Sequence, residues 1–175
     1  MDFAISTADA LGVSDLELSE LLLRVYVEGG FVEAEMAVAL FEPAAVRRRG
    51  KIITARETRS SSLSGMVIVV DANSPAHRFA QGTETEMHLL GIKPEFRGHG
   101  LGRALVAAAI DDAIRSGSSK MLLWTQATMH AAQRLYESSG FSRVPSRDFS
   151  RAGRDFKMYE KQLGVDIADG RGDVD

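Results

Sequence analysis

The pattern of apolar and polar positions at the start of the chain predicts one short strand followed by two helices. Residues 3–6 form the predicted strand. Ser14 and Glu17 have the spacing of a capping box, in which two side chains bond the free amides of a helix start. The helix that follows gathers its apolar residues on one face, and a glycine pair ends it. A second helical stretch is predicted over residues 33–49.

Extended segments and a polar loop come next. Residues 51–57 and 65–71 predict two strands on either side of a serine-rich turn, and a hairpin is the simplest connection between them. Residues 73–82 form a polar loop. Residues 85–92 alternate along the chain, which predicts a further strand that runs into Pro94 and a glycine-dense turn.

The C-terminal half alternates helices with strands. A long helix is predicted over residues 101–116, because apolar residues repeat every four positions along one side. Its buried side is expected to carry Leu101, Leu105, Ala109, Val106, Ile110 and Ile114, and its wet side Arg103, Asp111, Asp112 and Arg115. The remaining pattern predicts a strand over 120–125, a helix over 128–139, and strands over 141–144 and 155–162.

This order of elements predicts an α/β fold with a mixed sheet, in a single domain over residues 1–163. The chain has 175 residues, of which 45% are apolar and 26% charged, so it is long enough for one sizeable core. Residues 164–175 are acidic, glycine-rich and nearly free of large apolar groups. We expect this tail to be disordered.

Composition and charge exclude several kinds of chemistry. The sequence has no cysteine, which rules out disulfides, thiolate metal sites and a cysteine nucleophile. Its formal net charge of -3 gives no general attraction to nucleic acid or to an anionic membrane. No apolar run approaches the ~20 residues that span a bilayer, and no export signal is present, so we expect a soluble cytoplasmic protein. The histidines lack metal-ligand spacing, and no metal is expected.

Residues 97–102 read Arg-Gly-His-Gly-Leu-Gly and stand between a predicted strand and a predicted helix. Glycines at a helix start expose backbone amides at the positive end of the helix dipole, an arrangement that binds phosphate or pyrophosphate. A Rossmann turn would need glycine where Arg103 stands, and a P-loop would need Lys and then Ser or Thr after its last glycine. We therefore expect an anionic ligand of another kind. A turn that only lets strand and helix pack closely is the structural alternative.

Three segments of the chain carry motifs that follow one another in the order expected of a single family. The turn carries Arg97, Gly100 and Gly102, and residues 86–96 before it form a strand that ends in a Pro-Glu turn and an aromatic residue. Residues 132–141 read Ala-x-x-Leu-Tyr-Glu-x-x-Gly-Phe. Together these segments resemble the GNAT superfamily of N-acetyltransferases. The resemblance implies a GNAT acyl-CoA N-acyltransferase fold, with a mostly antiparallel central sheet flanked by helices, and acetyl-CoA as cosubstrate.

The resemblance also implies how CoA is held. In the family, amides of the glycine-rich turn bind the CoA pyrophosphate, which agrees with the dipole argument. The donors here would be His99, Gly100, Leu101 and Gly102, with Arg97, Gly98 and Arg103 beside them. The family's central strand splays from its neighbour, so backbone groups at Leu90 and Ile92 would pair with the pantetheine arm of CoA.

Direct acetyl transfer needs a base, because an alkylammonium with a pKa of ~10.4 is almost wholly protonated at neutral pH. Alternation along residues 85–92 places Glu84, Glu86, His88 and Leu90 on one face, with Met87 and Leu89 on the other. Glu86 matches the position at which some GNAT enzymes carry their base and is our first candidate. His88 is the second, because its ordinary pKa of ~6.5 suits the task. A solvent-facing strand would show the same alternation.

Tyr136 is the candidate general acid, because family members often use a tyrosine of this segment to protonate the CoA thiolate. Core packing of its ring is the alternative. The sequence departs from the family at Met129, where an asparagine that bonds the CoA arm is frequent.

The sequence therefore predicts an N-acetyltransferase that moves the acetyl group of acetyl-CoA directly to a primary amine. A catalytically silent acyl-CoA-binding module and a scaffold without ligand remain as alternatives. The acceptor, a small-molecule amine or a protein amine, is not identified, and a homodimer is left open. No nucleophile elbow supports hydrolysis. Arg47, Arg48 and Arg49 are interpreted as the solvated end of a helix, where cations complement the dipole.

Overall fold

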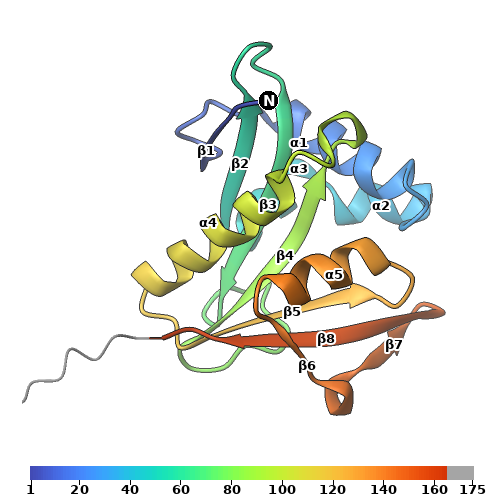
Figure 1. Cartoon of the computed structure of the whole chain (residues 1–175). Helices are drawn as coiled ribbons and strands as arrows, with labels where there is room; N and C mark the ends of the chain where they lie inside the picture. The colour runs from blue at the N-terminus through green and yellow to red at the C-terminus, as the bar shows by residue number, and fades with distance from the viewer. Residues whose placement is uncertain (165–175) are drawn as a thin grey trace, which may run out of the picture.

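A mixed sheet of eight strands forms the centre of the computed structural model, which describes residues 1–164 (Figure 1). The strands are β1 (Phe3–Thr7), β2 (Lys51–Glu57), β3 (Leu63–Asp71), β4 (Glu84–Ile92), β5 (Lys120–Gln126), β6 (Ser142–Arg143), β7 (Phe149–Arg151) and β8 (Arg154–Gln162). They lie in the order β1-β2-β3-β4-β5-β8-β6, and β7 pairs with β8. Every pair is antiparallel except β4 with β5.

Helices cover both faces of this sheet (Figure 1). One face carries α1 (Asp15–Leu22), the π-helical η1 (Leu23–Val27), α2 (Ala34–Leu40) and α3 (Pro43–Arg49). The other face carries α4 (Leu101–Arg115) and α5 (His130–Ser138). Short 3-10 turns, η2 (Pro94–Phe96) and η3 (Pro145–Arg147), lie in the connections. The predicted α/β class and its mixed, mostly antiparallel sheet are confirmed.

Strand β3 lies between the two helical layers and is apolar on both sides. Val67 and Val69 belong to the core cluster under α4, whereas Ile68 and Val70 belong to the cluster under α1. Successive side chains of a strand point to opposite faces, so a strand that is buried on both faces has a continuous apolar run. The two clusters fix β4, the neighbour of β3, at the centre of the molecule.

Side-chain caps set two helix starts in the N-terminal half. Helix α1 begins at the predicted capping box, in which Ser14 and Glu17 each accept a hydrogen bond from the other's amide. The single helix predicted over residues 33–49 is wrong. Glu42 accepts bonds from two amides of the following turn, and Pro43 cannot continue a helix because it lacks an N–H. A new helix, α3, therefore begins at this point.

Two residues of α4 lie on the side opposite to the predicted one. Asp112 is only 8% exposed and accepts a hydrogen bond from Lys51 Nζ at 2.8 Å. Ile114 is 42% exposed. A series at every fourth position drifts by about 40° around a helix at each step, which carries Ile114 off the buried face.

The sequence pattern missed β7. Its Phe149 stacks on Phe156 with the ring centroids 5.0 Å apart, but a strand of only three residues carries too little alternation to be recognised. Apart from Gly164, the tail predicted to be disordered lies outside the described residues. The single domain over residues 1–163 stays a prediction.

Strands β4 and β5 separate part of the way along the sheet. Their pairing joins Glu84, Thr85 and Glu86 to the start of β5 and continues no further. On the other side of β4, the register with β3 shifts between Met66 and Ile68. The two strands therefore open a gap at the centre of the sheet, as expected from the resemblance.

An irregularity in β4 changes which residues share a face. Leu89 has a φ of 49°, a left-handed conformation that interrupts the alternation of side chains. Leu90 consequently packs with Met87 against the α4 cluster, and Leu89 packs against the α1 cluster. The predicted alternation, which grouped Leu89 with Met87, is wrong beyond His88.

Candidate active site

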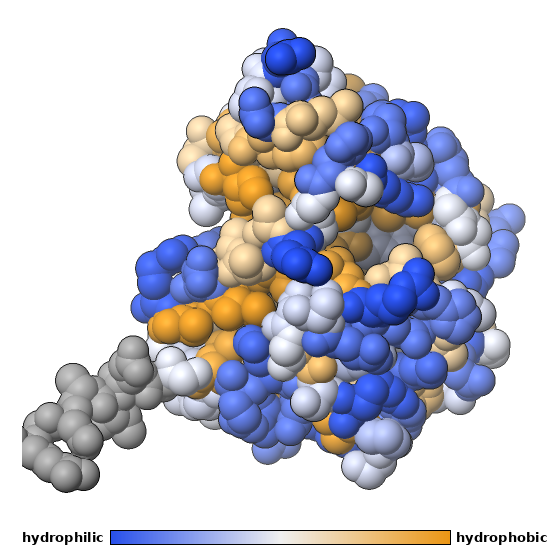
Figure 2. Space-filling view, in the orientation of Figure 1, coloured by the Kyte–Doolittle hydropathy of each residue, from blue (hydrophilic) through white to orange (hydrophobic). Residues whose placement is uncertain are grey.

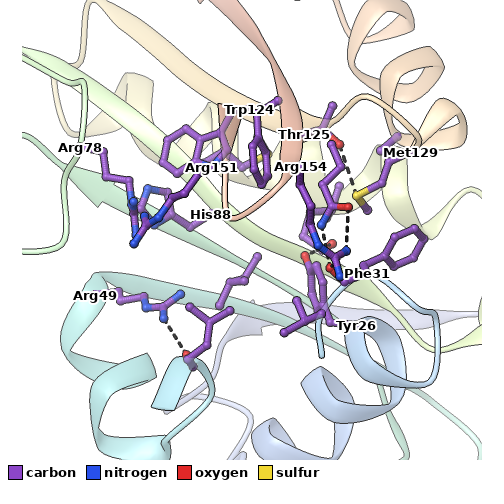
Figure 3. Close-up of a pocket in the computed structure, with 18 of the residues that line it drawn as sticks. Tyr26, Phe31, Arg49, Arg78, His88, Trp124, Thr125, Met129, Arg151 and Arg154 are labelled. Carbon is purple, nitrogen blue, oxygen red and sulfur yellow. Dashed lines mark hydrogen bonds between the residues drawn. The ribbon is translucent and has the colours of Figure 1, made fainter. Parts of the chain in front are cut away.

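A cavity of about 540 Å³ opens where β4 and β5 separate. Its walls come from the second half of β4, the end of β5, helix α5, and from η1, α2 and α3 on the opposite layer. The loop before β4 and the turn between β7 and β8 also line it. Figure 2 shows the opening as a recess between α2 and α5, and Figure 3 shows side chains that line the cavity.

Glu86 lies beneath this cavity rather than in its wall, with no exposed surface. Its carboxylate accepts hydrogen bonds from the amides of Arg78, Phe79 and Ala80 and contacts His88. Burial alone would raise the pKa of Glu86, but these hydrogen bonds outweigh it and lower the pKa to about 2. Glu86 is therefore a fixed anion that holds the loop before β4 in place. The solvent-facing alternative for this part of β4 is wrong.

His88 connects this anion to the cavity. Its Nε2 lies 2.6 Å from Glu86 Oε2, its ring lies 4.8 Å from the Trp124 ring, and its side chain lines the cavity. An ionised carboxylate can only accept, so Nε2 carries the hydrogen and Nδ1 keeps a lone pair. Burial lowers the pKa of His88, although the bond to Glu86 opposes this effect. The imidazole is therefore neutral at pH 7 and held in one tautomer.

Two tyrosines line the cavity, and their hydroxyls differ in availability. Tyr26 donates to the carbonyl of Leu90 at 2.9 Å. The hydroxyl of Tyr136 has no hydrogen-bond partner within residues 1–164, while its ring packs against Phe141 and Tyr159. Burial raises the pKa of Tyr136 well above its usual range, so this residue stays protonated. The ring of Tyr136 is therefore packed, as the alternative allowed, while its role as the general acid stays a prediction.

The glycine-rich turn forms the start of α4, as predicted. Gly98 and Gly100 have φ values of 80° and 78°, and a side chain at either position would meet no atom within 4 Å. No side chain caps the helix, so the amides of its first turn remain available. Residues of a shallow pocket at this point include Ile92, Arg97, Gly98, Gly100, Leu101, Gly102 and Arg103.

The remaining residues predicted to contact the cofactor differ in their position and in the polar groups that they leave available. His99 is exposed and lines neither the pocket nor the cavity. The carbonyl of Ile92 accepts a bond from Arg97 Nε at 3.1 Å, and the carbonyl of Leu90 is taken by Tyr26. The amides of these two β4 residues, and the second lone pair of each carbonyl, are candidates for the pantetheine arm. A Cβ at Gly102 would lie 3.0 Å from Ile92 Cδ1, so this glycine serves close packing.

Sequence reasoning missed most of the cavity wall. Met129, noted as a departure from the family, lines the cavity and accepts a weak bond from Thr125 Oγ1 at 3.5 Å. The loop after η1 reaches the far wall, where Gln126 Nε2 donates to the carbonyl of Phe31 at 2.7 Å. Local patterns could not have identified such residues because they come from separate elements: Tyr26, Phe31, Met36, Leu40, Phe41, Arg49, Arg78, Trp124, Phe149, Arg151, Arg154 and Phe156.

Within residues 1–164, His, Asp and Glu side chains nowhere gather in groups of three or more that could hold a metal ion. None of the helices described is long and apolar enough to cross a bilayer.

Comparisons with known proteins agree with this geometry. A model of the acetyltransferase (GNAT) family matches residues 17–141. Mycothiol acetyltransferase of Kocuria rhizophila is 45% identical over 58 residues, which are 33% of this chain and 19% of that protein. N-acetylaspartate synthetase of Danio rerio is 33% identical over 92 residues, which are 52% of this chain and 32% of that protein. The chain thus matches well under two thirds of either relative.

A solved structure extends the similarity to nearly the whole fold. The acetyltransferase of Bacillus subtilis in complex with CoA has a TM-score of 0.66 and 19% sequence identity, covering 93% of this chain and 99% of that chain. The family model spans both the N-terminal wall of the cavity and the glycine-rich turn. This chain belongs to the acetyltransferase (GNAT) family.

Proposed function

We propose that this protein transfers the acetyl group of acetyl-CoA directly to a primary amine. The observation that carries the proposal is the buried pair of Glu86 and His88, which presents a neutral imidazole to a cavity at the separation of β4 and β5. Names of the relatives support it, since the Kocuria rhizophila protein is named mycothiol acetyltransferase and the Danio rerio protein is named N-acetylaspartate synthetase.

The residues at the start of α4 fit the pyrophosphate of CoA. The amides of the turn and of the helix start, from His99 to Gly102, lie at the positive end of a helix of 15 residues, and no side chain caps that helix. Arg97 and Arg103 add positive charge beside the turn. The amides of Leu90 and Ile92 would bond the pantetheine arm in the manner of an added strand. Bound there, acetyl-CoA supplies an activated acetyl thioester.

His88 is the better of the two candidates for the base. Its Nδ1 can accept a proton from the acceptor's ammonium, and Glu86 then stabilises the imidazolium that forms. Glu86 itself is held at a pKa of about 2 by several donors and lies outside the cavity wall, so it is a weak base with no access to the amine. We therefore assign proton transfer to His88 and the positioning of its tautomer to Glu86.

Tyr136 is proposed to donate a hydrogen bond from its hydroxyl to the departing sulfur. A thiol has a pKa of ~8.5 in cysteine, so the thiolate is a tolerable leaving group and the donor's contribution is modest. The raised pKa of Tyr136 keeps its hydroxyl protonated, so the hydroxyl can stabilise the charge that develops on sulfur. We also propose that the protein is cytoplasmic, because a chain without cysteine is compatible with a reducing compartment.

Release of free CoA thiol tests the proposal. Wild-type protein, acetyl-CoA and a broad panel of primary amines are expected to give thiol release that depends on the amine, with His88→Gln slower by about 10²- to 10⁴-fold. Arg134→Gln, on the exposed side of α5, is the control and is expected to keep wild-type activity. Tight binding of CoA without turnover on any amine would instead identify a silent acyl-CoA-binding module.

A further inference from the structure

The charges that line the cavity are all of one sign. Its wall contains four arginines, Arg49, Arg78, Arg151 and Arg154, together with two histidines, and no aspartate or glutamate. A concave wall of one charge attracts ligands of the opposite charge. The chain as a whole carries a net charge of -3, so this positive region is local to the cavity.

Only one of these arginines is neutralised by a carboxylate within residues 1–164. Arg154 Nη2 lies 3.0 Å from Glu33 Oε1 and so ties the loop after η1 to β8. Arg49 Nη2 donates to the carbonyl of Leu40 at 2.6 Å, which leaves its charge uncompensated. Arg78 lies over the Trp124 ring at 5.9 Å. Neither Arg78 nor Arg151 forms an ion pair in the described part of the chain.

The three arginines without a carboxylate partner come from separate elements and gather at one end of the cavity. Figure 3 shows Arg78, from the loop before β4, and Arg151, from the end of β7, reaching toward each other, with Arg49 of α3 directed to the same side. Burial and then the charge of Arg78 lower the pKa of Arg49, and burial and then the charge of Arg151 lower that of Arg78. Like charges are therefore crowded together here.

The nearest fixed anion compensates this charge only in part, because the charge of Glu86 opposes the lowering of the pKa of Arg78 but forms no ion pair with it in the described part of the chain. Glu86 is already bonded by three backbone amides and by His88, and it does not reach the cavity wall. A bound anion is the simplest group that would relieve the repulsion among the guanidinium groups. Arginine is well suited to such a role because its planar fork bonds a carboxylate through two parallel N–H groups.

We propose that the acceptor amine also carries a carboxylate, as an α-amino acid does, and that Arg49, Arg78 and Arg151 bind it. The site for the negative group is close to the base, because Arg78 and His88 both lie against Trp124, at 5.9 and 4.8 Å from its ring centre. An anion so near the reacting nitrogen fits a compound whose amine and carboxylate are a few bonds apart. Apolar walls at Phe31 and Leu40 would take the side chain.

This inference rests on the proposed acetyl transfer, and matched acceptors test the two separately. Leucine and glutamate are each compared with their C-terminal amides, which keep the amine and remove the α-carboxylate. The acids are expected to have a kcat/KM at least about tenfold higher than their amides, because the amides cannot form the charge-assisted bonds to the arginines. Equal kcat/KM for acids and amides would overturn the carboxylate site while leaving acetyl transfer intact.

Variants of the arginines test whether these residues cause the preference for a carboxylate. Arg78→Gln and Arg151→Gln are expected to raise KM for leucine about tenfold or more and to leave KM for leucinamide and the binding of acetyl-CoA unchanged. Arg48→Gln removes a neighbouring charge from the exposed side of the same helix as Arg49, outside the cavity, and serves as the control. An equal rise of KM for leucine and leucinamide would contradict the assignment.

A binding measurement covers the case in which no amine is acetylated. Calorimetry with CoA-saturated protein compares N-acetylleucine with N-acetylleucinamide. Tighter binding of the acid, lost in Arg78→Gln, would support the carboxylate site even though the proposed transfer had failed. If no amine is acetylated and the two compounds bind equally or not at all, the carboxylate site is overturned as well as the transfer.

Discussion

Gly100→Asp should strongly weaken CoA binding while leaving the fold intact. The residue has a φ of 78° with open space around it, and it stands at the uncapped start of α4. An aspartate there adds a negative charge, and its carboxylate can bond the same first-turn amides that would hold the pyrophosphate. Losing two charge-assisted bonds of about 1.5–3 kcal/mol each weakens binding by about 10²- to 10⁴-fold.

Gly117→Asp is the matched control at the other end of α4. Gly117 has the same φ of 78° and equally open surroundings, so the cost of a left-handed non-glycine residue is shared by both variants. Calorimetry with CoA and thermal melting of both proteins separate binding from folding. We expect Gly117→Asp to melt no higher than Gly100→Asp, because its carboxylate lies at the negative end of the helix dipole, and we expect a loss of CoA affinity in Gly100→Asp alone. Unchanged CoA affinity in Gly100→Asp would refute the assignment of the pyrophosphate to this turn.

Three further changes probe the site. Gly102→Asp is expected to destabilise the protein by about 1–3 kcal/mol in a denaturant titration, because its Cβ would lie 3.0 Å from Ile92 and 3.1 Å from Leu135; a stability equal to that of Gly100→Asp would contradict the packing role. Tyr136→Phe should lower kcat by about 10²-fold with little change in acetyl-CoA affinity or melting temperature, whereas a lower melting temperature with normal kcat would make Tyr136 a core residue only. In Glu86→Gln, kcat should fall, and the acid limb of the pH profile of kcat should move to lower pH, because the hydrogen bond and charge of Glu86 raise the pKa of His88. An acid limb at the wild-type pH would exclude this coupling.

The elements that follow from local patterns were predictable from the sequence. The capping box at Ser14, the strand over β4 and the glycine-rich turn before α4 each depend on neighbours within a few residues, and the structure has all of them. The break at Pro43 is also local, but the periodicity of the flanking residues concealed it. The bulge at Leu89 is set by pairing with β3, which no local pattern reports.

The chemistry of the site depends on contacts between distant segments. Glu86 and His88 were recognised as candidates from their shared face. Which of the two is the better base depends on the amides of residues 78–80, which fold back onto the carboxylate of Glu86. The arginine cluster is a similar case. Arg49 looked like the end of a solvated helix, and only the tertiary fold brings it near Arg78 and Arg151.

Transfer of a labelled acetyl group tests the central claim most directly. The protein is mixed with acetyl-CoA that carries a deuterated acetyl group and with the best amine from the panel, and mass spectrometry then follows both the amine and the intact protein. We expect the label on the amine nitrogen and none on the protein, because the chain has no cysteine and the base serves direct transfer. Label held covalently by the protein during turnover, or no labelled amine at all, would contradict the account.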